Sequence, residues 1–334
     1  MSSAGQRPLQ IGDVVEVRPP AEILATLDEH GALDGLPFMP EMLEYMGRRH
    51  RVSTRVEKVC DTINGMRSRR MHSTVYLEDL RCDGSAHGGC QAACRLYWRD
   101  DWLTRIPDGS EPSPVSRQDE AYLQLERVAR AGSRPPPSEG GELDLFRCQA
   151  TEALTASEPL SNNELSQYAR ELRSGNVGVR RLLVVAIRAI GVRLGGILVG
   201  PISLQSRIIS RLRPGRLVTE PMRLAVGDWV RVRSDEEIVR TLNASGKNRG
   251  LWFDREMRSF CGGTYQVKAR IERIIDERTG RMLLIESDCI ELDGVVCSGD
   301  YSKGRWLCPR AIPPYWREAW LTRADPPPPR RPGA

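Results

Sequence analysis

The chain has 334 residues, of which 40% are hydrophobic and 28% charged, and its net charge is +5. This length and composition predict a globular protein of about two domains and exclude a small disulfide-stapled scaffold. A charge this small for the length does not predict nucleic-acid binding by the chain as a whole.

The first ten residues, MSSAGQRPLQ, contain no apolar stretch of the kind found in a secretory signal peptide. We therefore expect a cytoplasmic protein. In a reducing compartment, clustered cysteines are more often metal ligands or redox groups than disulfides. The chain has nine cysteines, and this odd number also argues against complete pairing.

The first elements follow from residue patterns. Residues 12–18 alternate apolar and polar side chains, which predicts a half-buried strand. Pro20 is suited to open a helix, with Ile23, Leu24 and Leu27 on one face, and Gly31 ends it. Residues 51–60 and 74–80 predict two strands of a hairpin.

The same order of residues returns 215 positions later. The offset holds to Cys82 and Cys297, after which three extra residues intervene. Matched pairs include Gly12 and Gly227, Thr26 and Thr241, Phe38 and Phe253, Glu41 and Glu256, Arg55 and Arg270, Cys90 and Cys308, and Trp98 and Trp316. We interpret the chain as a tandem duplication.

These patterns predict an α+β fold of two homologous small units, each a barrel of the Src-homology-3-like kind with a helix inserted after its first strand. A partly helical basic segment joins them. The predicted divisions are a Cys-rich repeat at 10–105, a flexible linker at 106–141, a central helical basic segment at 142–220, a second Cys-rich repeat at 221–323 and a disordered tail at 324–334.

The region between the repeats alternates linkers and helices. Pro107–Pro114 and Ser133–Gly141 are rich in Pro, Gly and Ser, as flexible linkers are. We predict helices over residues 118–131, from an N-cap at Ser161 to Arg173, and along the apolar residues 181–199.

Positive charge is concentrated in the central segment. Residues 170–220 hold ten arginines, all within Arg170–Arg216, and two glutamates, a net charge of +8. This segment could contact a protein partner or an anionic membrane surface, which would place the chain peripherally at the inner membrane face. A transmembrane helix is disfavoured because Arg188 and Arg193 would lie in the middle of the bilayer. The alternative is a packed helix with its arginines in water, and nucleic-acid recognition motifs are absent.

Each repeat contains four cysteines, and these are the candidate metal ligands. Four thiolates, or three with one imidazole, suit a structural zinc ion, whereas soft sulfur ligands equally suit an iron–sulfur cluster. The candidates are Cys60, Cys82, Cys90 and Cys94 with His87 in the first repeat, and Cys261, Cys289, Cys297 and Cys308 in the second. Only Cys82/Cys297 and Cys90/Cys308 are equivalent between the repeats, so the halves either use different ligands or share one site.

Two other interpretations of the cysteines stay open. Unpaired cysteines commonly serve as small buried hydrophobic residues that neither react nor bind a metal. Cys90 with His87 has the residue types of a nucleophile and its base, although no third orienting group is identifiable.

The tryptophans recur with the same spacing in both halves, as Trp98 and Trp102 and as Trp316 and Trp320. At helical spacing they predict core packing rather than stacking on a ligand. Asp100, Asp101 and Glu318 lie between them and predict a solvated side.

Several longer motifs resemble those of a bacterial protein family to which no activity is assigned. They are GDxVxV, GLxFxPEM, CDGSAHGGCQA, FRCQATEAL (Phe146–Leu154), RELRSGNV (Arg170–Val177), and the C-terminal NRGLWFDREM, CPR and PYWREAWL, and they cover most of residues 10–323. The resemblance implies that Cys148 belongs to the functional set. Met46 departs from it, because a cysteine is usual there.

The sequence thus favours a metal-stabilised tandem binding, scaffold or accessory protein, with zinc as the expected metal. The alternative is an enzyme that uses an iron–sulfur cluster or a reactive cysteine thiolate. No combination of residues predicts a catalytic site.

Overall fold

The computed structural model describes residues 7–65, 67–106, 115–134, 145–161, 164–198, 222–301 and 305–327. The chain divides into two compact units, of which the first comprises Met1–Val185, Arg273–Leu283 and Gly304–Arg310, and the second comprises Ala186–Glu272, Leu284–Lys303 and Ala311–Ala334. The predicted linker at Pro107–Pro114, most of that at Ser133–Gly141, most of the tail, and the arginines from Arg207 to Arg216 lie outside the described residues.

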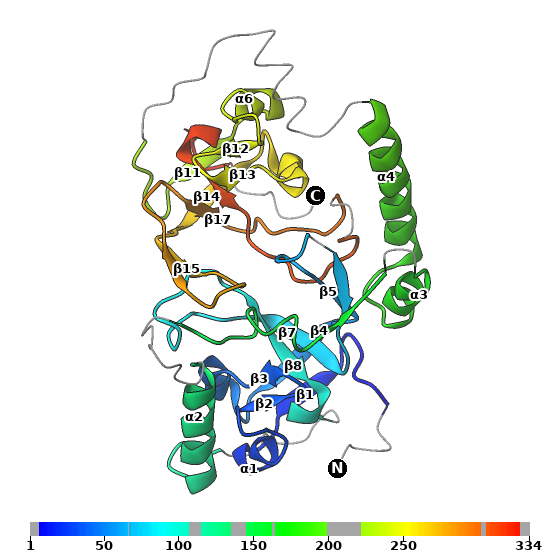
Figure 1. Ribbon diagram of the computed structural model, residues 1–334, viewed down its shortest axis with the longest axis vertical. Helices are drawn as coiled ribbons and strands as arrows, with labels where there is room; N and C mark the ends of the chain where they lie inside the picture. Colours follow the sequence, from blue (N-terminus) through cyan, green and yellow to red (C-terminus); the bar gives the residue numbers. More distant parts are fainter. Residues whose placement is uncertain are drawn as a thin grey trace. The chain divides into compact units, whose positions relative to one another are not determined.

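A curled antiparallel sheet of five strands forms the base of the first unit, in the order β8-β7-β4-β1-β9 (Figure 1). Its strands are β1 (Val14–Val17), β4 (Arg49–Arg55), β7 (Thr74–Arg81), β8 (Arg95–Arg99) and β9 (Leu103–Arg105). Short elements connect them: α1 (Pro20–Leu24), β2 (Ala32–Leu33), β3 (Leu36–Pro37), and the 3₁₀ turns η1 (Pro40–Tyr45) and η2 (Asp100–Trp102). A small sheet in the order β10-β6-β5 contains β5 (Lys58–Cys60), β6 (Ser68–Arg70) and β10 (Glu158–Pro159).

The second unit contains a sheet in the corresponding order β18-β17-β14-β11-β19. Its strands are β11 (Trp229–Val232), β14 (Thr264–Arg270), β17 (Ile290–Leu292), β18 (Tyr315–Trp316) and β19 (Leu321–Arg323). The connecting elements are α6 (Asp235–Val239), β12 (Lys247–Asn248), β13 (Leu251–Trp252), η3 (Arg255–Phe260) and η4 (Glu318–Trp320). A further hairpin, which pairs β15 (Arg273–Ile275) with β16 (Met282–Leu284), belongs to the first unit except for Leu284.

Strand register is the same in the two sheets. The pairs are Val14 with Arg51 and Val15 with Arg105 in one, and Trp229 with Gln266 and Val230 with Arg323 in the other. A one-residue slip would turn every side chain to the opposite face, so this agreement places corresponding residues in corresponding surroundings. The structure is compatible with the predicted α+β fold of two similar units.

The tryptophans lie in the cores of both units, as predicted. Trp98, Trp102, Trp316 and Trp320 are completely buried. The indole N–H of Trp102 donates to the Thr26 hydroxyl at 3.1 Å, and that of Trp320 donates to Thr241 at 2.8 Å. The helical interpretation of their spacing is wrong, because in each unit a strand carries the first tryptophan and a 3₁₀ turn carries the second.

A buried arginine stabilises the same corner of each unit. Arg99 is 2% exposed and donates to the carbonyl oxygens of Leu33, Asp34 and His72 at 2.7–3.3 Å. Arg317 makes the equivalent contacts in the second unit, with the carbonyls of residues 248, 249 and 288. Each guanidinium therefore satisfies turn carbonyls that would otherwise be buried without a donor.

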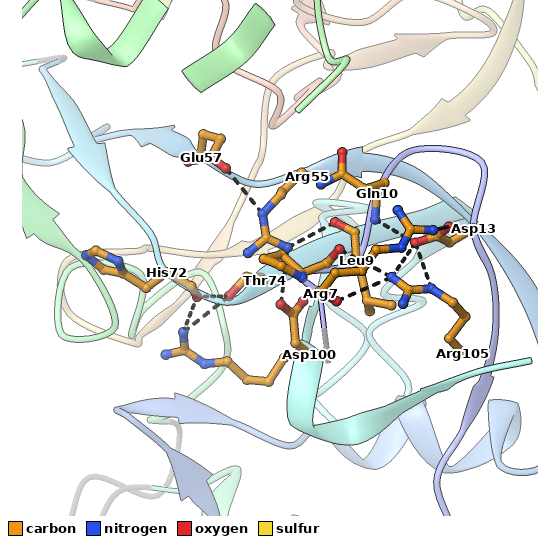
Figure 2. Close-up of polar contacts among 12 residues, drawn as sticks. Arg7, Leu9, Gln10, Asp13, Arg55, Glu57, His72, Thr74, Asp100 and Arg105 are labelled. Atoms are coloured by element: carbon orange, nitrogen blue, oxygen red, sulfur yellow. Dashed lines mark hydrogen bonds and ion pairs between the residues drawn. The ribbon is translucent and has the colours of Figure 1, made fainter. Parts of the chain in front are cut away.

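The acidic residues beside the tryptophans do not form a solvated side, which corrects the sequence prediction. Asp100 is half-buried and accepts from Arg55 at 3.1 Å (Figure 2). Glu318 is 4% exposed and accepts from Arg270 at 2.7 Å and from the backbone N–H groups of residues 222–224. Both carboxylates anchor loops on the sheet.

The predicted strand at 51–60 is two strands, β4 and β5, which belong to different sheets. The helix predicted from Ser161 begins instead at Ser166, as α3 (Ser166–Arg173). The helix predicted over residues 118–131 is α2 (Glu120–Gly132), which packs on α1 in the first unit (Figure 1).

The apolar, arginine-bearing segment forms α4 (Val179–Leu198), as the sequence predicts. Val179, Leu183, Ile187 and Ile190, which form the apolar face of α4, are each more than half exposed. No helix in the described part of the chain is long and apolar enough to cross a membrane.

Candidate metal centre

The loop after β7 is held in a fixed conformation by its own backbone. The N–H of Cys82 donates to the carbonyl of Cys94 at 2.8 Å, which closes the base of the loop. Inside it, the Gly84 carbonyl accepts the N–H groups of His87 and Gly89 at 2.9 and 3.0 Å. Gly84 has a φ of +72°, and a Cβ there would collide with the backbone of the following turn. Only glycine fits this position.

This turn brings His87 and Cys82 against Glu41 of η1. One ligand atom of each side chain lies within 4.8 Å of the others. Nδ1 of His87 is 2.7 Å from Oε1 of Glu41, and the Cys82 thiol donates to the same oxygen at 3.7 Å. The imidazole is 1% exposed and Glu41 is 8% exposed, so water is largely excluded.

Two polar atoms of the cluster have no hydrogen-bond partner among the described residues: Oε2 of Glu41 and Nε2 of His87. Buried polar atoms are nearly always satisfied, so each such atom requires an explanation. Binding of a cation is one such explanation, because carboxylate oxygens and imidazole nitrogens are both common metal ligands.

The electrostatics of the cluster determine which proton a cation would displace. Burial raises the pKa of the Glu41 carboxyl, but the hydrogen bond and charge of His87 outweigh it, and the net shift is downward. Burial, with the nearby Glu41 charge, raises the pKa of the Cys82 thiol far above its ordinary value. Without a metal the cluster therefore contains a carboxylate and a protonated thiol at neutral pH. A divalent ion would displace the thiol proton.

The geometry also fits an ion. Zinc bonds of 2.0–2.3 Å in a tetrahedron separate the ligand atoms by about 3.5 Å. One ligand atom of each of the three side chains lies within 4.8 Å of the others, so small side-chain movements would bring them to that separation. A carboxylate and a thiolate also offset the charge of a divalent cation, which lowers the cost of burying it.

The second unit has the corresponding backbone contact and the corresponding glutamate, but no cluster of this kind among its described residues. The N–H of Cys297 donates to the carbonyl of Ile312 at 2.9 Å, as Cys82 does to Cys94. Glu256, the equivalent of Glu41, accepts from the Ser298 hydroxyl at 2.8 Å and from the Tyr301 N–H at 2.8 Å. Both of its carboxylate oxygens are thus satisfied by protein donors.

Comparisons of the chain with protein-family models, curated proteins and solved structures find no match. The resemblance to a bacterial family stays a prediction.

Three more cysteines of the first unit lie near the cluster. Cys90 accepts the N–H of Ile275 at 3.3 Å. Burial raises the pKa of Cys94 to about 12 and that of Cys148 to about 11, and the charges of neighbouring thiols contribute to both shifts. The charges of Cys94 and Cys148 also contribute to the raised pKa of Cys82. Cys82, Cys90, Cys94 and Cys148 are therefore linked by electrostatic interactions within the first unit.

Cys60 and Cys308 form a separate pair in the first unit. They lie beside Arg310 rather than beside Glu41. The second unit contains the remaining candidates, Cys261, Cys289 and Cys297. Burial raises the pKa of Cys261 and of Cys289 to about 11 each. Within the ranges described above, no other three His, Cys, Asp or Glu side chains converge as closely as Glu41, Cys82 and His87.

Glu41 is the residue that the sequence prediction missed. It matches Glu256 at the offset of 215 residues, and this identity was the signal available in the sequence. That signal indicates a shared role in anchoring the loop. The addition of His87 in the first repeat alone is what converts the anchor into a possible ligand set.

Proposed function

We propose that this chain is a metal-binding protein whose first unit holds a zinc ion on Glu41, Cys82 and His87. The observation that carries the proposal is the convergence of a buried carboxylate, a buried imidazole and a partly buried thiol. The ion would join η1 to the loop after β7 and stabilise one unit of a tandem scaffold. We also propose that each curled sheet, with its helix after the first strand, is a Src-homology-3-like barrel.

A structural role agrees with the burial of the ligands. Structural zinc sites have four protein ligands, whereas catalytic sites keep one position open. Cys94 and Cys148 interact electrostatically with Cys82 and are the candidates for a fourth ligand, although a side-chain movement would be needed to bring either one into the group. Their pKa values are raised, so the fourth ligand would also lose a proton when the ion binds.

The test is elemental analysis of the full chain after purification without chelator. We expect about one zinc ion per chain in the wild type and a large loss in His87→Asn. The matched control is Glu256→Gln, which alters the equivalent loop of the second unit and should retain the metal. A metal-free, folded wild-type protein that also fails to take up added zinc contradicts the proposal.

The electrostatic interactions that link Cys82, Cys90, Cys94 and Cys148 support a second candidate, an enzyme with an iron–sulfur cluster or a reactive thiolate. Four thiolates are the usual ligands of such clusters, and a cluster of several iron atoms separates them more widely than one ion does. Anaerobic purification distinguishes the two candidates. Visible absorption with equal iron and sulfide contents favours the cluster, whereas colourless protein containing zinc favours the first proposal.

For the partner, we infer an anionic membrane surface that contacts the apolar face of α4. That face is exposed, Arg180 and Arg181 lie exposed on the same helix, and α4 contains no acidic residue. An amphipathic helix with arginines and exposed aliphatic side chains has the chemistry to lie in the interface of anionic lipids.

A further inference from the structure

Cys60 and Cys308 are far apart in the sequence but meet inside the first unit. Cys60 is the last residue of β5, and Cys308 lies in the segment Gly304–Arg310. The thiol of Cys308 donates a hydrogen bond to the sulfur of Cys60. The two residues are 4% and 7% exposed. The two thiols are therefore close neighbours, as a pair must be before a disulfide can form.

Arg310 fixes a positive charge beside this pair. Its Nη1 donates to the Cys60 carbonyl at 3.2 Å and lies 4.0 Å from the Cys60 sulfur. Its Nη2 donates to Glu277 at 2.7 Å, and the Thr62 hydroxyl accepts from Nη1 at 3.4 Å. With 5% exposure, the guanidinium is held in place by these contacts rather than by solvent.

The surroundings make the two thiols unequal. The hydrogen bond from Cys308 lowers the pKa of Cys60 most, and the positive charges of Arg310 and Arg305 add to it, against burial and the charge of Glu277. The pKa of Cys308 moves upward, because its proton is held in that same hydrogen bond. Cys60 therefore has thiolate character and Cys308 keeps its proton, which is the division between an attacking thiol and a resolving one.

A metal site explains this pair less well than it explains the Glu41 cluster. No third His, Cys, Asp or Glu joins the two sulfur atoms at ligand distance in the part of the chain that the structure describes. The guanidinium at 4.0 Å would also repel a cation bound to Cys60. A fixed positive charge instead stabilises a thiolate, which is the nucleophile in redox chemistry.

We propose that Cys60 and Cys308 form a reversible dithiol–disulfide couple that a hydroperoxide oxidises. The Cys60 thiolate attacks one peroxide oxygen of hydrogen peroxide and breaks the O–O bond, giving a sulfenic acid and hydroxide, which becomes water on protonation. The Cys308 sulfur then attacks the Cys60 sulfur and breaks the S–O bond, and its proton leaves with the hydroxyl as a second water. Two thiols and one hydrogen peroxide thus give one disulfide and two waters, and a dithiol reductant reverses the change.

The burial of the pair limits which oxidants can reach the two sulfur atoms. A peroxide molecule is small and uncharged, so it can reach sulfur atoms that are less than a tenth exposed. A bulky disulfide would have to open the unit first. The couple is independent of the proposed metal centre, because it shares no residue with it.

The first experiment needs no substitution. The full wild-type chain is reduced, freed of reductant, treated with one equivalent of hydrogen peroxide, alkylated and mapped by peptide mass spectrometry. We expect a cross-linked peptide pair containing Cys60 and Cys308, with the loss of two hydrogen atoms, and its disappearance on reduction. Recovery of both residues as alkylated thiols, while other cysteines oxidise, overturns the proposal.

Variants then separate the roles of the two thiols. In Cys308→Ser, the Cys60 sulfenic acid should accumulate and react with dimedone, whereas Cys60→Ser should abolish both the adduct and the cross-link. Cys289→Ser, which removes a buried thiol of the second unit, is the matched control and should oxidise as the wild type does. Equal dimedone labelling of Cys60→Ser and Cys308→Ser contradicts the assigned order.

The pH profile tests the part played by Arg310. The groups that face the pair are Cys60 and Cys308 themselves, Arg310, Arg305, Glu277, Tyr97 and Lys58. In Arg310→Met, the pH at which Cys60 oxidises at half its maximal rate should rise, because one of the positive charges that lower the pKa of Cys60 is lost while the hydrogen bond from Cys308 remains. Arg310→Lys keeps the charge and should restore most of the wild-type profile. An unchanged profile in a folded Arg310→Met protein would show that the guanidinium does not activate Cys60, and would overturn this part of the proposal.

Discussion

Nδ1 of His87 lies 2.7 Å from Oε1 of Glu41, and this contact distinguishes the two loops of the protein. In the second unit the equivalent carboxylate, Glu256, accepts from Ser298 and Tyr301 instead. A glutamate in this position therefore anchors the loop whether or not a histidine is present. In the first unit it also leaves one oxygen and one ring nitrogen without a protein donor or acceptor among the described residues.

Substitution of Glu41 by glutamine should weaken zinc binding by about 10–100-fold, the range found when groups that hold or orient metal ligands are removed. The amide keeps the volume and can still accept from the Ala86 N–H, so the loop should stay folded. Competition with a chromophoric chelator measures the affinity. The paired variant Glu256→Gln should bind as the wild type does, and an equal loss in both variants would assign the effect to loop stability.

Zinc affinity should rise with pH, by about tenfold per pH unit for each proton displaced. The pKa of Cys82 is raised by burial and by Glu41, so the thiol is protonated in the metal-free protein. The pKa of Glu41 is lowered, so that carboxyl is already ionised and releases no proton. Raising the pH removes proton competition at Cys82 and strengthens binding. Titration calorimetry in buffers of different ionisation enthalpy counts the protons, and Cys82→Ser should release about one fewer.

Sequence patterns predicted the elements whose residues alternate or repeat. The 12–18 strand, α2 and α4 follow from local hydrophobic order, and so does the start of the helix at Pro20, although that helix ends at Leu24 rather than at Gly31. The strand predicted over residues 51–60 was not recognised as two, because its apolar pattern continues across the point where the chain changes sheet.

The polar interior could not be predicted in the same way. Glu41, Arg99 and Glu318 are charged residues, which pattern analysis assigns to the surface, yet each is less than a tenth exposed. What stabilises them is a set of donors or carbonyls from distant segments, and spacing along the chain does not reveal those partners. Cys82 and His87 were predicted as ligands from their types, whereas Glu41 required the fold to place η1 beside the loop.

Removal of the buried guanidinium in Arg99→Met should reduce the free energy of unfolding of the first unit by about 3–5 kcal/mol. The methionine side chain can fill the volume of the aliphatic part of the arginine. The carbonyls of Leu33, Asp34 and His72, however, lose their hydrogen-bond donor. Chemical denaturation monitored by tryptophan fluorescence measures the change. Arg48 has a side chain that is 54% exposed and pairs only with Glu44 among the contacts observed. Arg48→Met should therefore change stability by less than about 0.5 kcal/mol, and a similar loss in both variants would argue against a special role for Arg99.

Substitution of the apolar face of α4 should release the protein from anionic lipid. In the double variant Leu183→Asp and Ile187→Asp, binding to vesicles containing phosphatidylglycerol should fall by at least about tenfold, because two aliphatic side chains no longer enter the interface and two negative charges are added. Vesicle co-sedimentation measures the bound fraction. Leu284→Asp, at a residue that is 72% exposed outside α4, is the control and should bind as the wild type does. Since Arg180 and Arg181 contribute electrostatically, wild-type binding should also weaken as salt is raised. Binding that is unaffected by the double variant and by salt would direct the search for a partner away from the membrane and toward a protein.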